Sequence, residues 1–234
     1  MTIKLSVLAS NCLLCGDFTK RDISLCKACE DSLPRIEHAC KQCGIPLENI
    51  NTPNDLCGQC IQNPPEVDYT VSLFHYANPV SYLIGQMKFQ QQLSSAAILA
   101  SLLHSEILKR YSGMTLPDAI LPVPLHNARL AQRGFNQSLE ISRDVAKQKK
   151  IPLLIDQVSR EKHTEAQTHL NKQQRLKNVK GCFKVLSTPV AKHIVIVDDV
   201  ITTGATTNEL AMLLKAEGVE KVGVWSIARA DIGS

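Results

Sequence analysis

Eight of the nine cysteines in this 234-residue chain form four Cys-x-x-Cys pairs within the first sixty positions. Two intervening residues let both sulfurs of a tight turn face one tetrahedral metal ion. The glycines that follow Cys15 and Cys43 permit the positive backbone φ angle that such a turn needs. The spacing therefore predicts one or two structural Zn²⁺ ions, bound by Cys12, Cys15, Cys26, Cys29, Cys40, Cys43, Cys57 and Cys60.

Other uses of these cysteines fit less well. A disulfide framework needs an oxidising compartment, and residues 1–10 match neither a signal peptide nor a lipoprotein signal. A thioredoxin-like site needs one pair at the start of a helix in a βαβ unit, whereas here four pairs crowd a loop-rich segment. The simplest pairing is sequential, two pairs for each ion, and an interleaved pairing stays open. A closed site of four cysteines has no open coordination position, so we expect no catalysis by the metal.

A second set of chemically active residues follows a run of apolar, β-branched residues at 194–197. Asp198 and Asp199 come directly after this run, at the carboxyl end of a predicted strand where open α/β sheets bind ligands. The loop that follows leads into a predicted helix, whose first N–H groups attract phosphate. The two carboxylates are suited to accept hydrogen bonds from ribose hydroxyls and favour a nearby Mg²⁺. Acidic pairs and Thr caps are common separately, and the order in which they occur here is more specific.

The run from 194 to 207 resembles the phosphoribosyl-pyrophosphate (PRPP) motif of type I phosphoribosyltransferases along its whole length. The resemblance implies that Asp198 and Asp199 are the catalytic pair that holds the 2′ and 3′ hydroxyls of the ribose. It implies that the following loop cradles the 5′-phosphate, through Thr202, Thr203, Gly204, Ala205, Thr206 and Thr207. The run lacks the Gly-Lys-Thr element of a Walker A loop.

Three basic residues are candidates for contacts with pyrophosphate. Arg129 and Arg133 follow the Pro-Val-Pro-Leu segment at 122–125, and their guanidinium groups suit bidentate binding of phosphate. An ordinary solvated basic turn is the alternative for these two. The long polar segment after Arg160 has the composition of a flap over an anionic ligand, and Lys162 is its preferred phosphate contact. His163 and His169 in that segment have no assigned role.

The strands and helices predicted around these residues indicate an α/β domain. Two prolines at 64 and 65 mark a boundary, so we expect a zinc-ribbon module at 1–65 and a larger domain at 66–234. Strands are predicted at 67–76, 118–123, 153–158, 182–186, 193–197 and 221–228, and helices at 79–89, 94–111, 136–149 and 206–217. Apolar strands that alternate with helices predict a parallel sheet with helices on both faces.

Composition limits the function classes. Hydrophobic residues make up 44% and charged residues 21% of the chain, as in globular proteins, and no apolar run is long enough to enter a membrane. The net charge of +4 does not single out nucleic acid as a partner, and 4% aromatic residues leave few platforms for stacked bases. We expect a cytoplasmic protein.

Taken together, the motifs at 12–60, 122–125, 133–137, 164–167 and 197–204 resemble the ComF (ComFC) family over nearly the full chain. Membership implies a zinc-binding, phosphoribosyltransferase-like protein that takes part in natural transformation, in handling single-stranded DNA that has entered the cytosol. Its implied partners are PRPP with Mg²⁺, single-stranded DNA and proteins of the DNA-uptake machinery.

Three functions compete on these residues. The first is a phosphoribosyltransferase of unknown acceptor, for which no general base is identifiable. The second is a non-catalytic module that senses PRPP or binds DNA and proteins, with structural zinc. Basic residues of the ribbon segment permit this second function, although a solvated surface explains them equally: Lys20, Arg21, Lys27, Arg35 and Lys41. The third is a scaffold that has lost its ligand, which the intact acid pair and Thr-rich loop oppose.

Overall fold

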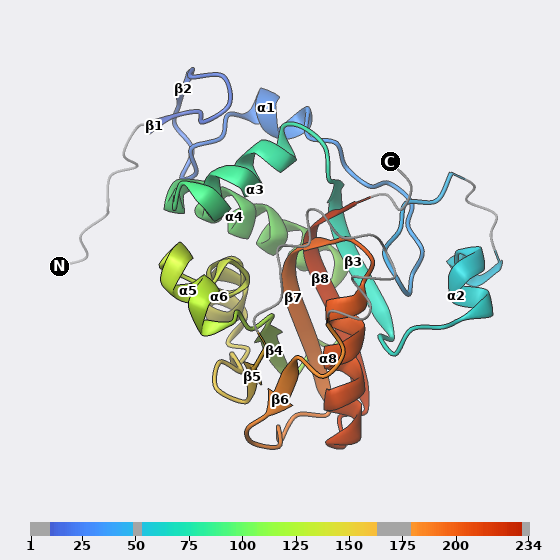
Figure 1. The fold of residues 1–234 in the computed structure, drawn as a ribbon. Helices are drawn as coiled ribbons and strands as arrows, with labels where there is room; N and C mark the ends of the chain where they lie inside the picture. The colour runs from blue at the N-terminus through green and yellow to red at the C-terminus, as the bar shows by residue number, and fades with distance from the viewer. Residues whose placement is uncertain (1–9, 49–52, 163–178, 231–234) are drawn as a thin grey trace.

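A parallel sheet stands at the centre of the fold in the computed structural model, which describes residues 10–48, 53–162 and 179–230 (Figure 1). Within these residues its strand order is β3-β8-β7-β4, and all three neighbouring pairs run parallel. The strands are β3 (Tyr69–His75), β4 (Ala119–Pro122), β7 (His193–Ile201) and β8 (Lys221–Arg229). The order brings together segments that are far apart in the sequence.

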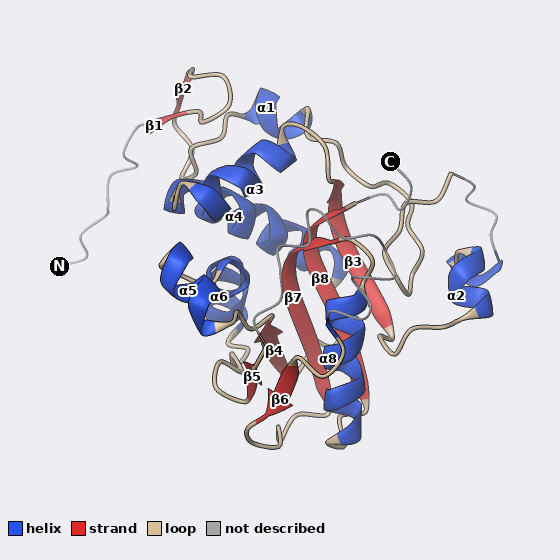
Figure 2. Cartoon of the chain, viewed as in Figure 1, coloured by secondary structure: helices blue, strands red, loops and turns tan. Residues whose placement is uncertain are grey.

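Helices cover both faces of the sheet, as the sequence predicts (Figure 2). One face packs against α3 (Val80–Phe89), α4 (Leu93–Arg110) and α6 (Gln137–Lys149). The other packs against α8 (Ala205–Ala216) and a small hairpin of β5 (Val158–Arg160) and β6 (Phe183–Val185). Each apolar layer forms its own cluster of buried side chains, so the sheet is buried on both sides.

The apolar run of β7 explains why this strand lies in the middle of the sheet. Successive side chains of a strand point to opposite faces, so a strand buried on both sides must be apolar throughout. Val195 and Val197 pack into the cluster under α3, α4 and α6, whereas Ile194 and Ile196 pack into the cluster under α8. All four side chains are fully buried.

Two of the sequence predictions need correction. Residues 153–158 do not form a strand, since only Leu153 makes a bridge with Ile120 of β4 before the chain bends away, and β5 begins at Val158. The segment after the Pro-Val-Pro-Leu motif, where the sequence predicts no helix, forms the helix α5 (Asn127–Arg133), so the alternative of a basic turn there is wrong. His126 caps the start of α5 through Nδ1, which accepts from the Ala128 N–H, and Gly134 ends it with a φ of 76°. That C-terminal glycine after a run of good helix formers was a usable signal.

The N-terminal segment forms two lobes that lie against the sheet domain. The first contains β1 (Ser10–Asn11), β2 (Phe18–Thr19) and α1 (Lys27–Asp31), and the second contains α2 (Gly58–Gln62). Between the lobes the chain runs along the edge strand β3, where the Ile36 N–H donates to the Leu73 carbonyl (3.0 Å) and the His75 N–H to the Pro34 carbonyl (2.9 Å). This segment covers part of the sheet edge, which would otherwise present unpaired backbone groups.

Candidate functional site

Asp198 and Asp199 lie where one neighbour of β7 ends and the other continues. Pairing of β7 with β4 stops at Val197, opposite Pro122, whereas pairing with β8 continues to Ile201. The sequence predicted that the two aspartates follow the strand. They lie inside β7 instead, because pairing with β8 extends the strand by four residues. They stand at the carboxyl edge of the sheet beside the end of a shorter strand, which is where parallel α/β sheets form a ligand crevice.

Asp199 is buried and forms an ion pair with a residue that the sequence analysis missed. Lys88 Nζ, from the last turn of α3, lies 2.7 Å from Asp199 Oδ2, and only 9% of the Asp199 side chain is exposed. No local motif marks Lys88, because it is a single lysine between the apolar residues Met87 and Phe89. The ion pair nevertheless fixes the negative charge of Asp199 at the crevice.

Asp198 has a different environment from its neighbour. Burial and, to a smaller extent, the charge of Asp199 raise the pKa of the Asp198 carboxyl to about 7, although the charge of Lys88 opposes both effects. The Asp198 carboxylate accepts hydrogen bonds from the Asp199 N–H (2.9 Å) and from Ser138 Oγ (3.3 Å) of α6. A carboxyl group that titrates near neutral pH at a crevice is typical of a ligand or catalytic site.

The loop after β7 encloses a small hollow at the start of α8. The hollow is lined by Asp198, Val200, Ile201, Thr202, Thr203, Gly204, Ala205, Thr206 and Thr207. Gly204 has a φ of 76°, a conformation open to glycine and costly for other residues. Thr203 Oγ1 accepts from the Ala205 N–H (3.3 Å), and Thr207 Oγ1 donates to the Gly204 carbonyl (3.0 Å). All six loop residues predicted from the sequence therefore line one hollow beside Asp198.

Arg129 and Arg133 lie on α5, in electrostatic reach of a third arginine. Burial lowers the pKa of Arg129, and the charges of Arg160 and Arg133 lower it further. Arg160 is itself buried, and its guanidinium group stacks over the Phe183 ring at 5.3 Å. Burial lowers the pKa of Arg160, whereas the charge of Asp198 acts in the opposite direction. Arg133 Nη1 donates to Gln137 Oε1 (2.9 Å) at the start of α6. Three guanidinium groups thus lie within electrostatic range of one another, and one of them, that of Arg160, is also within range of Asp198; such a cluster suits a polyanion such as pyrophosphate.

Lys162 lies at the base of the β5–β6 hairpin with an exposed side chain. Its ammonium group is near Gly181, whose N–H donates to Glu209 of α8 (2.6 Å). In the part of the chain that the structure describes, no hydrogen bond or ion pair joins Lys162 to the hollow. The rest of the predicted flap, with His163 and His169, falls outside the described residues.

The eight N-terminal cysteines form two separate sets, paired sequentially. Cys12, Cys15, Cys26 and Cys29 form one set, and Cys40, Cys43, Cys57 and Cys60 form the other; within each set all sulfurs lie within 4.8 Å of one another. A tetrahedral zinc site with Zn–S bonds of about 2.3 Å requires sulfurs about 3.8 Å apart. The distances from Cys15 to Cys26 and from Cys43 to Cys57 are both 3.7 Å.

The two sets repeat the same backbone turn. The Gly16 N–H donates to the Cys12 carbonyl and the Gly44 N–H to the Cys40 carbonyl, each at 2.9 Å. Both glycines have positive φ angles, 79° and 71°. The four sulfurs of each set thus fit a Zn²⁺ ion, and the sequential pairing of the cysteines is the one that the fold adopts.

The two lobes rest on the sheet domain in different ways. The first lobe packs its apolar residues Leu25 and Leu33 into the layer formed by α3 and α4. The second lobe binds through backbone polar groups, since the Lys41 carbonyl accepts from the Thr70 N–H (2.8 Å) and the Gln42 carbonyl from Thr70 Oγ1 (2.6 Å). The first attachment is therefore mainly apolar, and the second depends on directional hydrogen bonds.

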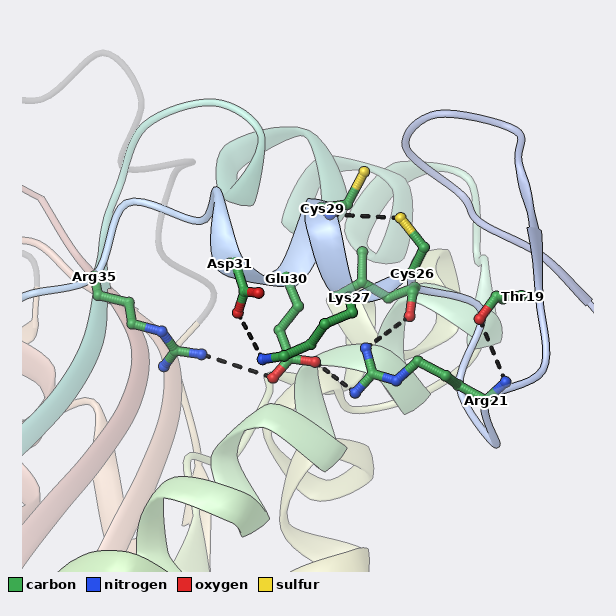
Figure 3. A network of polar contacts seen from close by, with 9 residues as sticks. Thr19, Arg21, Cys26, Lys27, Cys29, Glu30, Asp31 and Arg35 are labelled. Carbon is green, nitrogen blue, oxygen red and sulfur yellow. Dashed lines mark hydrogen bonds and ion pairs between the residues drawn. The ribbon is translucent and has the colours of Figure 1, made fainter.

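Most basic residues of the ribbon segment have acidic partners (Figure 3). Arg21 lies 2.5 Å and Arg35 3.9 Å from Glu30, and Lys27 lies 2.6 Å from Asp31. In the second lobe Lys41 lies 2.7 Å from Asp55. Four of the five basic residues considered as a nucleic-acid surface are thus paired within the protein, which reduces the positive potential of this face.

Within the described ranges, no helix combines the length and the apolar character that crossing a lipid bilayer would require.

Comparison with known proteins identifies relatives of both the cysteine-rich segment and the sheet domain. Two family models match: Double zinc ribbon domain over residues 5–61, and Phosphoribosyl transferase domain over residues 136–232. Competence protein F of Haemophilus influenzae is 41% identical over 182 residues, covering 74% of this chain and 78% of that protein. DNA utilization protein YhgH of Salmonella typhi is 39% identical over 179 residues, covering 76% of this chain and 79% of that protein.

More distant relatives are also similar. Competence protein ComFC of Streptococcus pneumoniae is 31% identical over 159 residues, which cover 68% of this chain and 67% of that protein. Among solved structures, a purine phosphoribosyltransferase from Pyrococcus horikoshii is 17% identical, covers 58% of this chain and 82% of its own, and has a TM-score of 0.32.

Proposed function

The chain belongs to the competence protein F (ComFC) family, and on that premise we propose that it binds PRPP together with Mg²⁺ at Asp198, Asp199 and the loop of residues 202–207. One observation carries the proposal. The acid pair and the Thr-rich hollow meet at the carboxyl edge of β7, beside the shorter strand β4, and Arg160 lies within electrostatic range of both Asp198 and Arg129 of α5. A ligand with a ribose between two phosphate groups has the chemistry that matches these three parts.

Each part of the site has a defined task in this proposal. Asp198 and Asp199 accept hydrogen bonds from the ribose hydroxyls, and the loop N–H groups and Thr hydroxyls of 202–207 bind the 5′-phosphate. Arg129 and Arg133, with Lys162 at the flap base, neutralise the pyrophosphate. The two carboxylates are also the groups here that would hold Mg²⁺, which offsets the charge of the pyrophosphate.

Turnover would be a phosphoribosyl transfer. An acceptor atom forms a bond to C1 of the ribose while the bond from C1 to the pyrophosphate oxygen breaks, and pyrophosphate leaves with the electron pair. Arg129 and Arg133 would stabilise the charge that develops on it. We assign no acceptor and no general base. The non-catalytic alternative, a PRPP sensor, uses the same binding site and differs in releasing no pyrophosphate.

We further propose that this site acts in natural transformation, on single-stranded DNA that has entered the cytoplasm. The names of the relatives from Haemophilus influenzae and Streptococcus pneumoniae support a role in competence, and that of the Salmonella typhi relative supports DNA utilization. The ion pairs on the first ribbon argue against a broad DNA-binding surface there. A search for surfaces of this chain that contact DNA or proteins of the uptake machinery should therefore not be restricted to the first ribbon.

Calorimetric titration of PRPP with Mg²⁺ tests the binding proposal. We expect saturable binding by the wild type and its loss in the isosteric variant Asp198→Asn/Asp199→Asn. Glu106→Gln is the matched control, because it removes a carboxylate from an exposed ion pair with Arg110 on α4, away from the loop. A folded, zinc-loaded wild type that does not bind PRPP would refute the proposal. Pyrophosphate release on addition of nucleobases or single-stranded DNA would then separate enzyme from sensor.

A further inference from the structure

Arg229, at the end of β8, connects the second cysteine set to the phosphate loop. Its Nε donates to the Cys43 carbonyl at 3.1 Å. Its Nη1 donates to the Ile201 carbonyl at 3.2 Å and to the Thr202 carbonyl at shorter range. One guanidinium group therefore contacts both a zinc-ligating residue and the first residues of the loop that lines the hollow.

Arg229 is almost completely buried, with 1% of the residue exposed. Burial of a cation is costly unless charge-assisted hydrogen bonds offset it, and the carbonyls of Cys43, Ile201, Thr202 and Ala230 provide such bonds. A buried apolar residue would fill this position without that cost. The arginine is thus used here for its directional donors.

The geometry of the guanidinium group explains how one side chain can hold both segments. Its donors lie in one rigid plane, so the carbonyls of Cys43 and Thr202 are kept at a fixed separation and orientation. In a trans peptide the C=O and the following N–H point in opposite directions. Holding the Ile201 and Thr202 carbonyls against Arg229 therefore directs the N–H groups of Thr202 and Thr203 away from it. Both residues line the hollow.

The cysteine side of this connection is rigid as well. Three successive carbonyls of the second knuckle, from Lys41, Gln42 and Cys43, all accept hydrogen bonds from the sheet domain. The knuckle is also tightly fitted, because a Cβ atom on Gly44 would come within 2.6 Å of Thr70 Cγ2. Because the packing leaves no free space at this surface, a displacement of the knuckle also displaces Thr70 and Arg229.

We infer that Arg229 is a positioning residue that couples the second cysteine set to the phosphate loop, so that an intact metal site keeps the loop ordered for an anionic ligand. The anionic ligand in this inference rests on the proposed function, whereas the coupling between the two segments does not. Because coupling free energies are reciprocal, a ligand in the loop stabilises the second metal site in return. The contacts identified for Arg229 among the described residues reach the second cysteine set, whereas the first set attaches through apolar packing.

Hydrogen–deuterium exchange of the full-length, zinc-loaded protein without ligand tests the coupling. In Arg229→Lys, which keeps the charge and loses the planar fork, we expect amides at 202–206 and at 41–45 to exchange at least tenfold faster, with zinc content unchanged. Arg35→Lys is the matched control, because Arg35 also lies between the ribbons and β3, over the Phe74 ring, and its ion pair in the described residues is with Glu30 of the first lobe. Unchanged exchange at 202–206 in Arg229→Lys would overturn the inference.

A second pair of variants keeps the test decisive if Arg229→Lys does not fold. Thr70→Val removes the hydroxyl that binds the Gln42 carbonyl and keeps the shape of the side chain, so we expect faster exchange at 202–206 in that variant too. Cys57→Ser, in the second set, should do the same, whereas Cys15→Ser, in the first set, should leave 202–206 unchanged. Equal effects of the two cysteine variants on the loop would contradict a connection specific to the second set.

Titration with PRPP and Mg²⁺ then separates the two proposals. If the wild type binds, Arg229→Lys should raise the Kd at least tenfold while Arg35→Lys leaves it unchanged. If the wild type does not bind, the proposed function fails and the exchange comparison still decides whether Arg229 couples the two segments.

Discussion

Lys88 Nζ lies 2.7 Å from Asp199 Oδ2, although one residue ends α3 and the other lies in β7. The Lys88 side chain is 20% exposed and that of Asp199 9%, so the pair is shielded from water on the side of the sheet. The helix layer thus supplies the counter-charge for Asp199, whereas the donors to Asp198 among the described residues, Ser138 Oγ and the Asp199 N–H, are neutral. The two acids should therefore respond differently to substitution and to pH.

Substitution Lys88→Met should destabilise the fold by about 2 kcal/mol, because a mostly buried carboxylate loses its charged partner. The double variant Lys88→Met/Asp199→Asn should recover most of that loss, since the unpaired charge is also gone. Urea denaturation of the wild type, both single variants and the double variant measures the coupling. A loss below about 0.5 kcal/mol in Lys88→Met would show that the pair behaves like an exposed one.

The stability of the ligand-free protein should fall as pH rises toward neutrality because of Asp198. Its pKa is raised to about 7 by burial and by Asp199, so the folded state holds a proton that an unfolded aspartate releases near pH 4. The free energy of unfolding therefore decreases between about pH 4 and pH 7, by at most about 1.4 kcal/mol per pH unit, and levels off above pH 7. Asp198→Asn should lose this component, which thermal unfolding at several pH values would detect.

Ligand binding should show the opposite pH trend at the same residue. The ionised Asp198 accepts stronger, charge-assisted hydrogen bonds from hydroxyl groups than the protonated form does, so affinity for PRPP should increase as pH rises through about 7. Titrations at pH 6 and pH 8 with the wild type and Asp198→Asn measure this difference. Equal pH dependence in both proteins would assign the effect to another group.

Gly44 and Gly16 provide a matched test of how the two knuckles are seated. Both have positive φ angles, so alanine costs about 1 kcal/mol at each from the backbone alone. A Cβ atom at Gly16 meets nothing within 4 Å, whereas one at Gly44 comes within 2.6 Å of Thr70 Cγ2 and 2.9 Å of Ser72 Oγ. Gly44→Ala should therefore cost roughly 2–4 kcal/mol in all, and Gly16→Ala only the smaller amount. Equal losses in unfolding experiments would mean that the second knuckle is not rigidly seated.

Metal content should follow the two cysteine sets. The wild type should carry two zinc ions per chain, and Cys26→Ser and Cys57→Ser one each, because each variant disrupts a different set. Cys182→Ser should keep both, since Cys182 belongs to the buried cluster under α8 and to neither set. Native mass spectrometry gives the count directly. One zinc ion in the wild type would contradict the assignment of two sites.

The contribution of the sequence is clearest where residues that act together lie within a few positions. The Cys-x-x-Cys turns at 12–15 and 40–43 fix two sulfurs by their spacing, and the fold adopts the sequential pairing that the sequence left open against an interleaved one. The loop at 202–207 follows its strand and precedes its helix directly, so one hollow was predictable. Gly134, which ends α5, is a local signal for a helix that the predicted elements did not include.

What the sequence by itself determined is therefore the chemistry of each short segment: two cysteine-rich metal sites, an acid pair with a phosphate loop, and apolar strands that alternate with helices. The tertiary structure decided which segments meet. The order β3-β8-β7-β4, the pair of Lys88 with Asp199, and the position of Arg229 between Cys43 and Thr202 all join residues that are distant in the chain. Such contacts depend on how whole faces pack, and a single lysine or arginine carries no local pattern that records its distant partner.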